Sequence, residues 1–240
     1  IKKQYDSIVK LLNKQRLKEA QTQLGAMLTA CSKADLHTRL EQAQTSYRYM
    51  LQYMRQGMND PERDKLYRNL LAETWDIACQ AKNNMLANIA GGYYQMMHNL
   101  YKGRTTYSLT DVRYLLENFE EDLAICQLMP DNLQRLEELV QQEEENNRFL
   151  FFMTWSDTAW SVETAAQAQA YLTSERMRAI DLALFVSAVT LSLTECFDIR
   201  KCLWLIDAYQ MSENMINQRA LVGLILTLYL HPNQASLYPE

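Results

Sequence analysis

The stretch FDIRKCLWLIDAYQMSENMINQRALVGLILTLYLHP, residues 197–232, decides the fold. Two apolar runs flank a four-residue polar turn, and each run is preceded by a basic residue. A membrane hairpin is excluded because the apolar segment 182–197 is shorter than the roughly 20 residues that a spanning helix needs. The last apolar run is also interrupted by Asn217, Gln218 and Arg219. The stretch therefore predicts two antiparallel helices of a protein that folds in water.

Both helices of this hairpin are apolar on more than one side. The helix after Asp198 carries Trp204 and Leu205 on one side, and on another it carries Ile199, Cys202, Leu203, Ile206 and Tyr209. The last helix is apolar nearly all round from Ala220 to Leu230. Helices with two apolar sides are sandwiched between neighbours. We therefore expect the hairpin to be one unit of a helical stack, whose apolar end face is exposed if the stack stops after Leu230.

The segment LSLTECFDIRKCLWLIDAY resembles a HEAT repeat, with a short turn at Asp198 and a second helix opened by Ile199 and Arg200. ENMINQRALVGLILTLYLHP is similar to the opening of a further unit, in which a basic, a small and a leucine residue follow one another at 219–221. The resemblance covers residues 180–240 and lacks the proline that the family usually carries in the first helix of a unit. It implies that Asp198 and Arg200 are structural and pair between adjacent turns.

The amino-terminal piece LLNKQRLKEAQTQLGAML, residues 11–28, resembles part of a tetratricopeptide repeat, although the Trp and Gly-Tyr marks of that family are missing. As a whole, the chain is similar to the amino-terminal part of long bacterial helical-repeat proteins of unknown function. We therefore expect it to be a fragment of a longer protein.

The remaining sequence extends the helical pattern in both directions. Six Gly and four Pro in 240 residues favour helices over hairpins of strands. Gly57 suits the end of one helix, Pro61 the start of the next, and Ser108 with Asp111 makes a capping box. The prediction is an all-α fold of stacked antiparallel helix hairpins (an α-solenoid) with about ten helices. Residues 1–104 would form tetratricopeptide-like hairpins or a bundle, and residues 105–240 acidic helices that run into HEAT-like repeats, all in one continuous array.

Charge divides the chain unevenly. Residues 1–110 hold 16 Lys and Arg against 9 Asp and Glu, whereas residues 111–240 hold 8 against 20. The basic half could attract acidic partners, and a nucleic-acid backbone is the alternative partner for its first helices. The acidic half repels phosphate, which argues against that alternative. The dense basic residues are Lys2, Lys3, Lys10, Lys14, Arg16 and Lys18, and the acidic face predicted to be solvated carries Glu137, Glu138, Glu143, Glu144 and Glu145.

Signatures of catalysis are absent from the sequence. The three histidines, His37, His98 and His231, have no second His at helical spacing, and there is no phosphate-binding or dinucleotide-binding loop. Five scattered Cys without a C-x-x-C pair are typical of reduced, buried thiols and favour a cytoplasmic setting. The sequence thus predicts no enzyme, no catalytic residue, no cofactor, no metal site and no membrane partner.

Two clusters of Tyr and Met, the first in residues 47–54 and the second in residues 93–101, carry more large side chains than one helix face can bury. Such residues are enriched in binding surfaces, and they also fill cores between helices. The functional prediction is a non-catalytic scaffold or adaptor that binds an unknown protein or peptide. Its candidate binding residues are Tyr47, Tyr49, Tyr53, Tyr93, Tyr94, Met97 and Tyr101.

Overall fold

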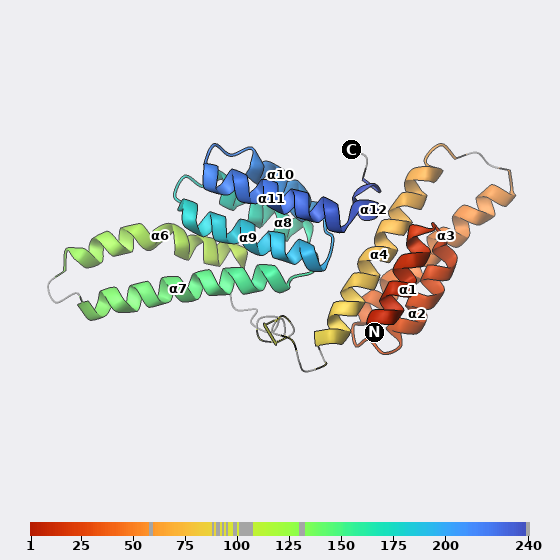
Figure 1. Ribbon diagram of the computed structural model, residues 1–240, viewed down its shortest axis with the longest axis horizontal. Helices are drawn as coiled ribbons and strands as arrows, with labels where there is room; N and C mark the ends of the chain where they lie inside the picture. Colours follow the sequence, from red (N-terminus) through yellow and green to blue (C-terminus); the bar gives the residue numbers. More distant parts are fainter. Residues whose placement is uncertain are drawn as a thin grey trace. The chain divides into compact units, whose positions relative to one another are not determined.

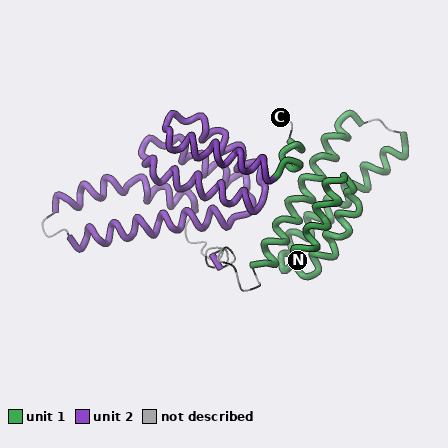
Figure 2. Tube along the Cα trace, viewed as in Figure 1, with its two compact units in different colours: residues 1–95, 231–240 green, residues 96–230 purple. Residues whose placement is uncertain are grey.

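The computed structural model describes residues 1–57, 60–87, 108–129 and 133–238, and between the second and third of these ranges residues 89, 92, 94, 96, 97 and 100. The helices assigned within these residues number eleven, and the described residues contain no strand, which confirms the all-α prediction (Figure 1). The chain divides into two compact units, residues 1–95 with 231–240 and residues 96–230 (Figure 2). The expected boundary between residues 104 and 105 lies outside the described residues.

Unit 1 is a bundle of four longer helices with one short helix added from the carboxyl end. Its helices are α1 (Lys2–Asn13), α2 (Leu17–Leu28), α3 (Ala34–Arg55), α4 (Arg63–Ala87) and α12 (Pro232–Ala235). Helix α4 packs against α1, α2 and α3, so the four long helices enclose one core. That core contains Leu24, Leu28, Leu36 and Ile77, each fully buried, and Leu237 packs against it. Helix α4 is thus the element that joins the other three long helices of unit 1.

A helix end and a turn separate α3 from α4, as predicted. Gly57 has a φ of 74°, a left-handed conformation that glycine adopts without strain at a helix end. The Asp60 side chain accepts a hydrogen bond from the Glu62 backbone N–H at 2.9 Å. Helix α4 begins at Arg63, two residues after Pro61, because the chain makes a turn at residues 61 and 62 before the helix starts.

Unit 2 is a stack of helices in two layers. Its helices are α6 (Leu109–Gln127), α7 (Leu133–Ser156), α8 (Val162–Thr173), α9 (Ala179–Glu195), α10 (Ile199–Tyr209) and α11 (Asn214–Leu230). Helix α9 packs between α7 and α11 in one layer, and α8 contacts α6 and α10 in the other. Each helix therefore meets the next but one along the chain, which is the contact pattern of stacked hairpins.

Aromatic side chains from three elements form the centre of unit 2. The Phe185 ring lies 4.6 Å from that of Tyr171 and 4.8 Å from that of Trp204, measured between centroids. The Tyr171 hydroxyl donates to the Leu109 carbonyl at 2.7 Å, and the Trp204 indole N–H donates to the Ala168 carbonyl at 2.9 Å. Both buried polar groups are thereby satisfied, and the same contacts tie α6, α8, α9 and α10 together.

Asp198 and Arg200 both make hydrogen bonds to Trp160, in the turn between α7 and α8. Asp198 caps α10 by accepting from the Arg200 backbone N–H, and its second oxygen accepts from the Trp160 N–H at 2.6 Å. The Arg200 guanidinium donates to the Trp160 carbonyl at 3.3 Å. Both residues therefore hold the turn between α7 and α8. Beside them Lys201, missed by the sequence analysis, is fully buried and donates to Ser192 Oγ at 2.7 Å.

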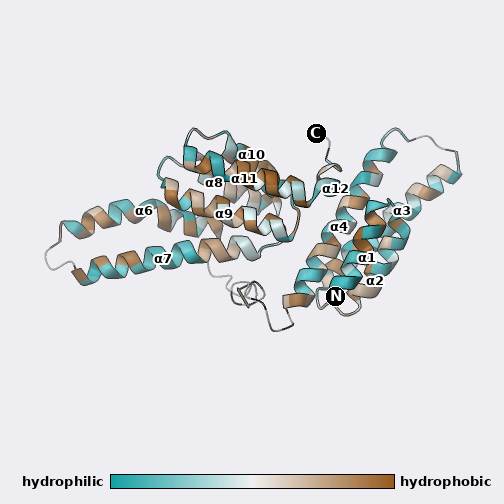
Figure 3. Ribbon diagram, viewed as in Figure 1, coloured by the Kyte–Doolittle hydropathy of each residue, from teal (hydrophilic) through white to brown (hydrophobic). Residues whose placement is uncertain are grey.

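The last hairpin, α10 with α11, is covered by neighbouring helices on one side only. The side of α10 that carries Trp204 and Leu205 is buried, whereas Leu203, Ile206 and Tyr209 are 51, 41 and 41% exposed. The buried side of α11 consists of Ile216, Ala220, Gly223 and Thr227, and the apolar residues on its other sides are open to solvent (Figure 3). This is the exposed apolar end face that the sequence predicted for a stack that stops after Leu230, since within the described residues no further layer covers α10 and α11. Within the part of the chain that the structure describes, none of the helices has the length and apolarity needed to cross a bilayer.

Candidate functional site

The seven residues predicted to bind a partner do not share one environment. Tyr49 and Tyr53 on α3 are 57 and 54% exposed, and Tyr47 is half-buried against the core of unit 1. Tyr94 and Met97 are buried, as the core interpretation of the second cluster expected. Tyr93 and Tyr101 lie outside the described residues. The first cluster thus supplies the exposed aromatic residues, and its Tyr47 lines a groove.

This groove runs between α2 and α3 and has a volume of about 580 Å³. We call it the basic groove. It is lined by Lys18, Gln21, Thr22, Gln44, Tyr47, Arg48, Leu51, Gln52 and Arg55. The lining contains three cationic side chains and no carboxylate, so its potential is positive.

The helix period explains how α3 builds one wall of the basic groove. Residues 44, 48, 51 and 55 follow at spacings of four, three and four, which places them on one face of a helix. The seam through Leu36, Leu40, Ala43 and Met50, which faces the core, lies about a quarter of a turn away. At the base of the groove, Gln44 Nε2 donates to the Gln21 carbonyl at 3.5 Å. The two helices are thereby joined below the cationic side chains.

The cations of the basic groove differ from Arg16, Arg39 and Arg63 of unit 1, which form ion pairs. Arg39 bridges α3 and α4 through Glu73 at 2.8 Å and Asp76 at 2.5 Å, and Arg16 pairs with Glu19 at 2.5 Å. Partial burial lowers the pKa of Arg39, but the hydrogen bonds that its guanidinium donates to the two carboxylates outweigh this and raise the pKa above its ordinary value. No ion pair among the described residues involves Lys18, Arg48 or Arg55. Residues 1–57 hold ten Lys and Arg against four Asp and Glu, so the surroundings do not cancel the charge of the groove.

Sequence analysis found Lys18 but missed Arg48 and Arg55. The signal was available, since both stand seven residues apart beside the apolar seam and share a face with Leu51. This cationic stripe lies beside the stronger apolar seam of the same helix, which makes it easy to overlook. The other basic residues singled out at the amino terminus, Lys2, Lys3, Lys10, Lys14 and Arg16, are exposed but do not line the groove.

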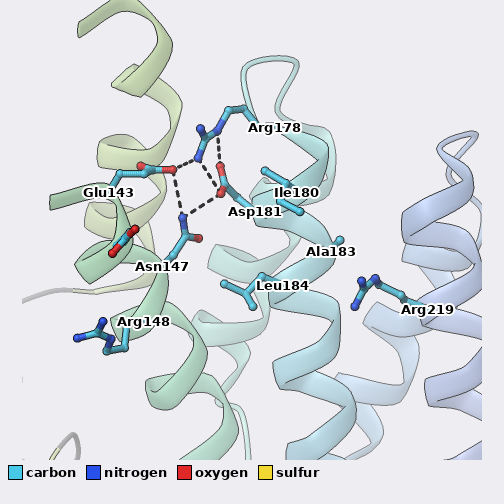
Figure 4. A pocket seen from close by; sticks show the side chains of 10 residues that line it. Glu143, Asn147, Arg148, Arg178, Ile180, Asp181, Ala183, Leu184 and Arg219 are labelled. Carbon is cyan, nitrogen blue, oxygen red and sulfur yellow. Dashed lines mark hydrogen bonds and ion pairs between the residues drawn. The ribbon is translucent and has the colours of Figure 1, made fainter. Parts of the chain in front are cut away.

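A second pocket, of about 500 Å³, lies between α7 and α9 of unit 2 (Figure 4). At one end Arg178 donates to both oxygens of Asp181 at 2.7 and 2.8 Å and also pairs with Glu143. Asn147 Nδ2 donates to Glu143 at 3.1 Å and to Asp181 at 2.9 Å. The two carboxylates, one guanidinium and one amide bind each other, so this cluster joins two helices of the stack.

Burial of Glu143 corrects the prediction of a fully solvated acidic face. Its side chain is 9% exposed because α9 covers that side of α7, whereas Glu137, Glu138, Glu144 and Glu145 are exposed as expected. Four carboxylates therefore remain available on the surface of α7.

The third surface is the end face, which we define as the outward apolar side chains of the α10–α11 hairpin. Val222, Ile225 and Tyr229 of α11 are 54, 58 and 80% exposed. We restrict the end face to six of these residues, Leu203, Ile206, Val222, Ile225, Leu226 and Tyr229. On α11 these positions follow at i, i+3, i+4 and i+7, so they form a continuous stripe.

Comparison of the chain with family models, with curated proteins and with solved structures finds no match. The function is therefore argued from the surfaces themselves.

Proposed function

We propose that the protein is a non-catalytic scaffold or adaptor module that binds another protein, and that the end face of unit 2 is a docking surface. The observation that carries this proposal is the exposed apolar stripe of α11. A water-exposed protein surface seldom has a contiguous apolar patch of this kind unless a partner covers it. Tyr229 adds a large, rigid aromatic side chain of the type enriched at the centres of interfaces.

The architecture of unit 2 supports the same proposal. In a helical stack each layer covers the apolar side of its neighbour, so a terminal hairpin with an apolar outer side is a ready template for one more helix pair. Helix α11 already packs along α9 on its inner side. A partner that presents apolar helices would therefore extend the stack in the geometry that the chain already uses.

Capture experiments with matched variants test this proposal. The bait is the whole chain, the end-face variant is Ile225→Glu with Tyr229→Glu, and the control is Asn214→Glu with Gln218→Glu. Both pairs add two negative charges to α11, but only the first removes apolar surface. We expect proteins that are captured by the wild type and the control, with or without nuclease, and lost with the end-face variant.

Two results would count against docking at the end face. Equal capture by both variants would show that the apolar stripe is not the contact. Capture that disappears after nuclease treatment would favour the alternative, binding of a nucleic-acid backbone by the basic helices of unit 1.

A further inference from the structure

We propose that the chain self-associates, with the acidic face of α7 in one copy lying in the basic groove between α2 and α3 of another. This inference goes beyond the proposed function and uses different surfaces. It rests on a match in charge and in spacing between two faces that the structure leaves exposed.

The groove side presents a cation, an apolar residue and a second cation on one helix face. Arg48, Leu51 and Arg55 stand at i, i+3 and i+7 of α3, so the two guanidinium-bearing positions are about 10.5 Å apart along the helix axis. Leu51 is half-buried between them, and both arginines are exposed. Lys18 of α2 adds a third charge from the opposite wall.

Helix α7 presents the complementary pattern at the same spacing. Glu137, Val140 and Glu144 also stand at i, i+3 and i+7, and Val140 is 41% exposed. Both carboxylates are exposed, and no ion pair among the described residues uses either of them. Leu133, one turn earlier on the same face, is 74% exposed and adds apolar surface.

The acidic face can be reached by another molecule. In unit 2 the α6–α7 hairpin projects beyond the ends of α8, α9, α10 and α11 (Figure 1). Helix α9 covers the side of α7 that carries Glu143, about a quarter of a turn from the face of Glu137 and Val140. Glu144 lies at the border of the two sides and also lines the pocket beside α9. A groove between two helices accepts a third helix, since side-chain ridges of one helix fit between those of its neighbours.

A helix suits this groove better than a nucleic-acid strand. Leu51 and Tyr47 offer apolar contact that a phosphate backbone cannot use, and only three cations are present over the length of the groove. The remaining basic residues of α1 lie outside it. Exposed charge pairs are individually weak, so the expected association is weak and sensitive to salt.

The experiment uses the whole chain and measures its weight-average mass by light scattering across a concentration series. The groove variant is Arg48→Glu with Arg55→Glu, and the helix variant is Glu137→Lys with Glu144→Lys. The control is Lys2→Glu with Lys3→Glu, which makes the same change in charge outside the groove. Circular dichroism at 222 nm checks that each variant is folded.

We expect the wild type and the control to self-associate at low salt and to become monomeric in 1 M NaCl, where charge interactions extend only about 3 Å. Each charge-reversed variant alone should associate at least about tenfold more weakly, because two attractions become repulsions. Mixing the groove variant with the helix variant should restore association, since each then meets the opposite charge.

Three outcomes would overturn the proposal. They are a wild type that is monomeric at every concentration, a groove variant that associates as the wild type does, and a mixture of the two variants that stays monomeric. Association that persists in 1 M NaCl and is lost with the end-face variant would also overturn it and would assign self-association to the end face. Failure of self-association would not count against docking at the end face, because the capture experiment changes α11 alone.

Discussion

Gly223 and Gly25 provide a test of the packing in which the same substitution should have opposite effects. Both glycines lie inside helices, where Gly→Ala ordinarily stabilises by about 1 kcal/mol. A Cβ on Gly25 would lie 3.8 Å from Leu40 Cδ2, an ordinary contact. A Cβ on Gly223 would lie 2.3 Å from Thr190 Oγ1 and 3.1 Å from Leu205 Cδ1. The second site has no room for a methyl group unless α9 and α11 separate.

The expected magnitude follows from these distances. Overpacking a well-filled contact costs about 1–3 kcal/mol, and the helix propensity of alanine offsets about 1 kcal/mol of that. Thr190 cannot turn away freely, since its hydroxyl donates to the Val186 carbonyl at 2.9 Å. Gly223→Ala should therefore destabilise by about 1 kcal/mol, whereas Gly25→Ala should stabilise by about 1 kcal/mol.

Urea denaturation followed by circular dichroism measures both changes, provided that the m-value stays constant. Thr190→Ala combined with Gly223→Ala should recover at least half of the loss, because it removes the closest atom, and Thr190→Ala alone completes the double-mutant cycle. If Gly223→Ala stabilises the protein as Gly25→Ala does, the close packing of α9 on α11 is refuted.

Three further predictions concern unit 2. Arg178→Met should destabilise by about 3–5 kcal/mol in urea, because it leaves two buried carboxylates without their cation, and a loss below about 1 kcal/mol would contradict that pairing. Burial raises the pKa of Cys202 to about 12, so this thiol should react slowly. Mass spectrometry should find it unmodified by iodoacetamide at pH 8 in the native protein and modified in urea. Labelling at the same rate in both states would show that the thiol is accessible. Ser108→Ala should cost about 1 kcal/mol through the lost cap of α6. The backbone N–H and the hydroxyl of Ser108 both donate to Asp111 and lower its pKa. Their contribution is present above the ordinary carboxyl pKa and is lost as the pH falls through the lowered value. Because Ser108→Ala removes only the bond from the hydroxyl, the stability difference between wild type and variant should narrow in part in acid, and a difference that does not change with pH would argue against that bond.

Helix positions were predicted from the sequence because the signals for them are local. The capping box of Ser108 and Asp111 and the glycine at 57 act within a few residues of where they stand. Leu36, Leu40, Ala43 and Met50 likewise recur at the helix period, which places them on the one side of α3 that faces the core. The stack of unit 2 was predicted from helices with more than one apolar side, and the end face was expected if no further unit follows Leu230.

The structure decided which of two equivalent apolar sides is buried. On α10 both sides are apolar, and only the packing of α8, α9 and α11 selects the side of Trp204 and Leu205. Glu143 looks like its acidic neighbours in the sequence, yet it is buried because Arg178, 35 residues later, supplies its countercharge. Long-range pairing of this kind leaves no local signal.

The basic groove, too, depends on contacts between residues that are far apart in the sequence. Composition determined an all-α protein with a positive amino-terminal half and a negative carboxy-terminal half. Only the packing of α2 beside α3 brings Lys18 next to Arg48 and Arg55 and keeps carboxylates out of the groove. A sequence determines which residues share a helix face, because the helix period is constant. The tertiary structure decides which faces meet, because that choice depends on contacts between residues far apart in the chain.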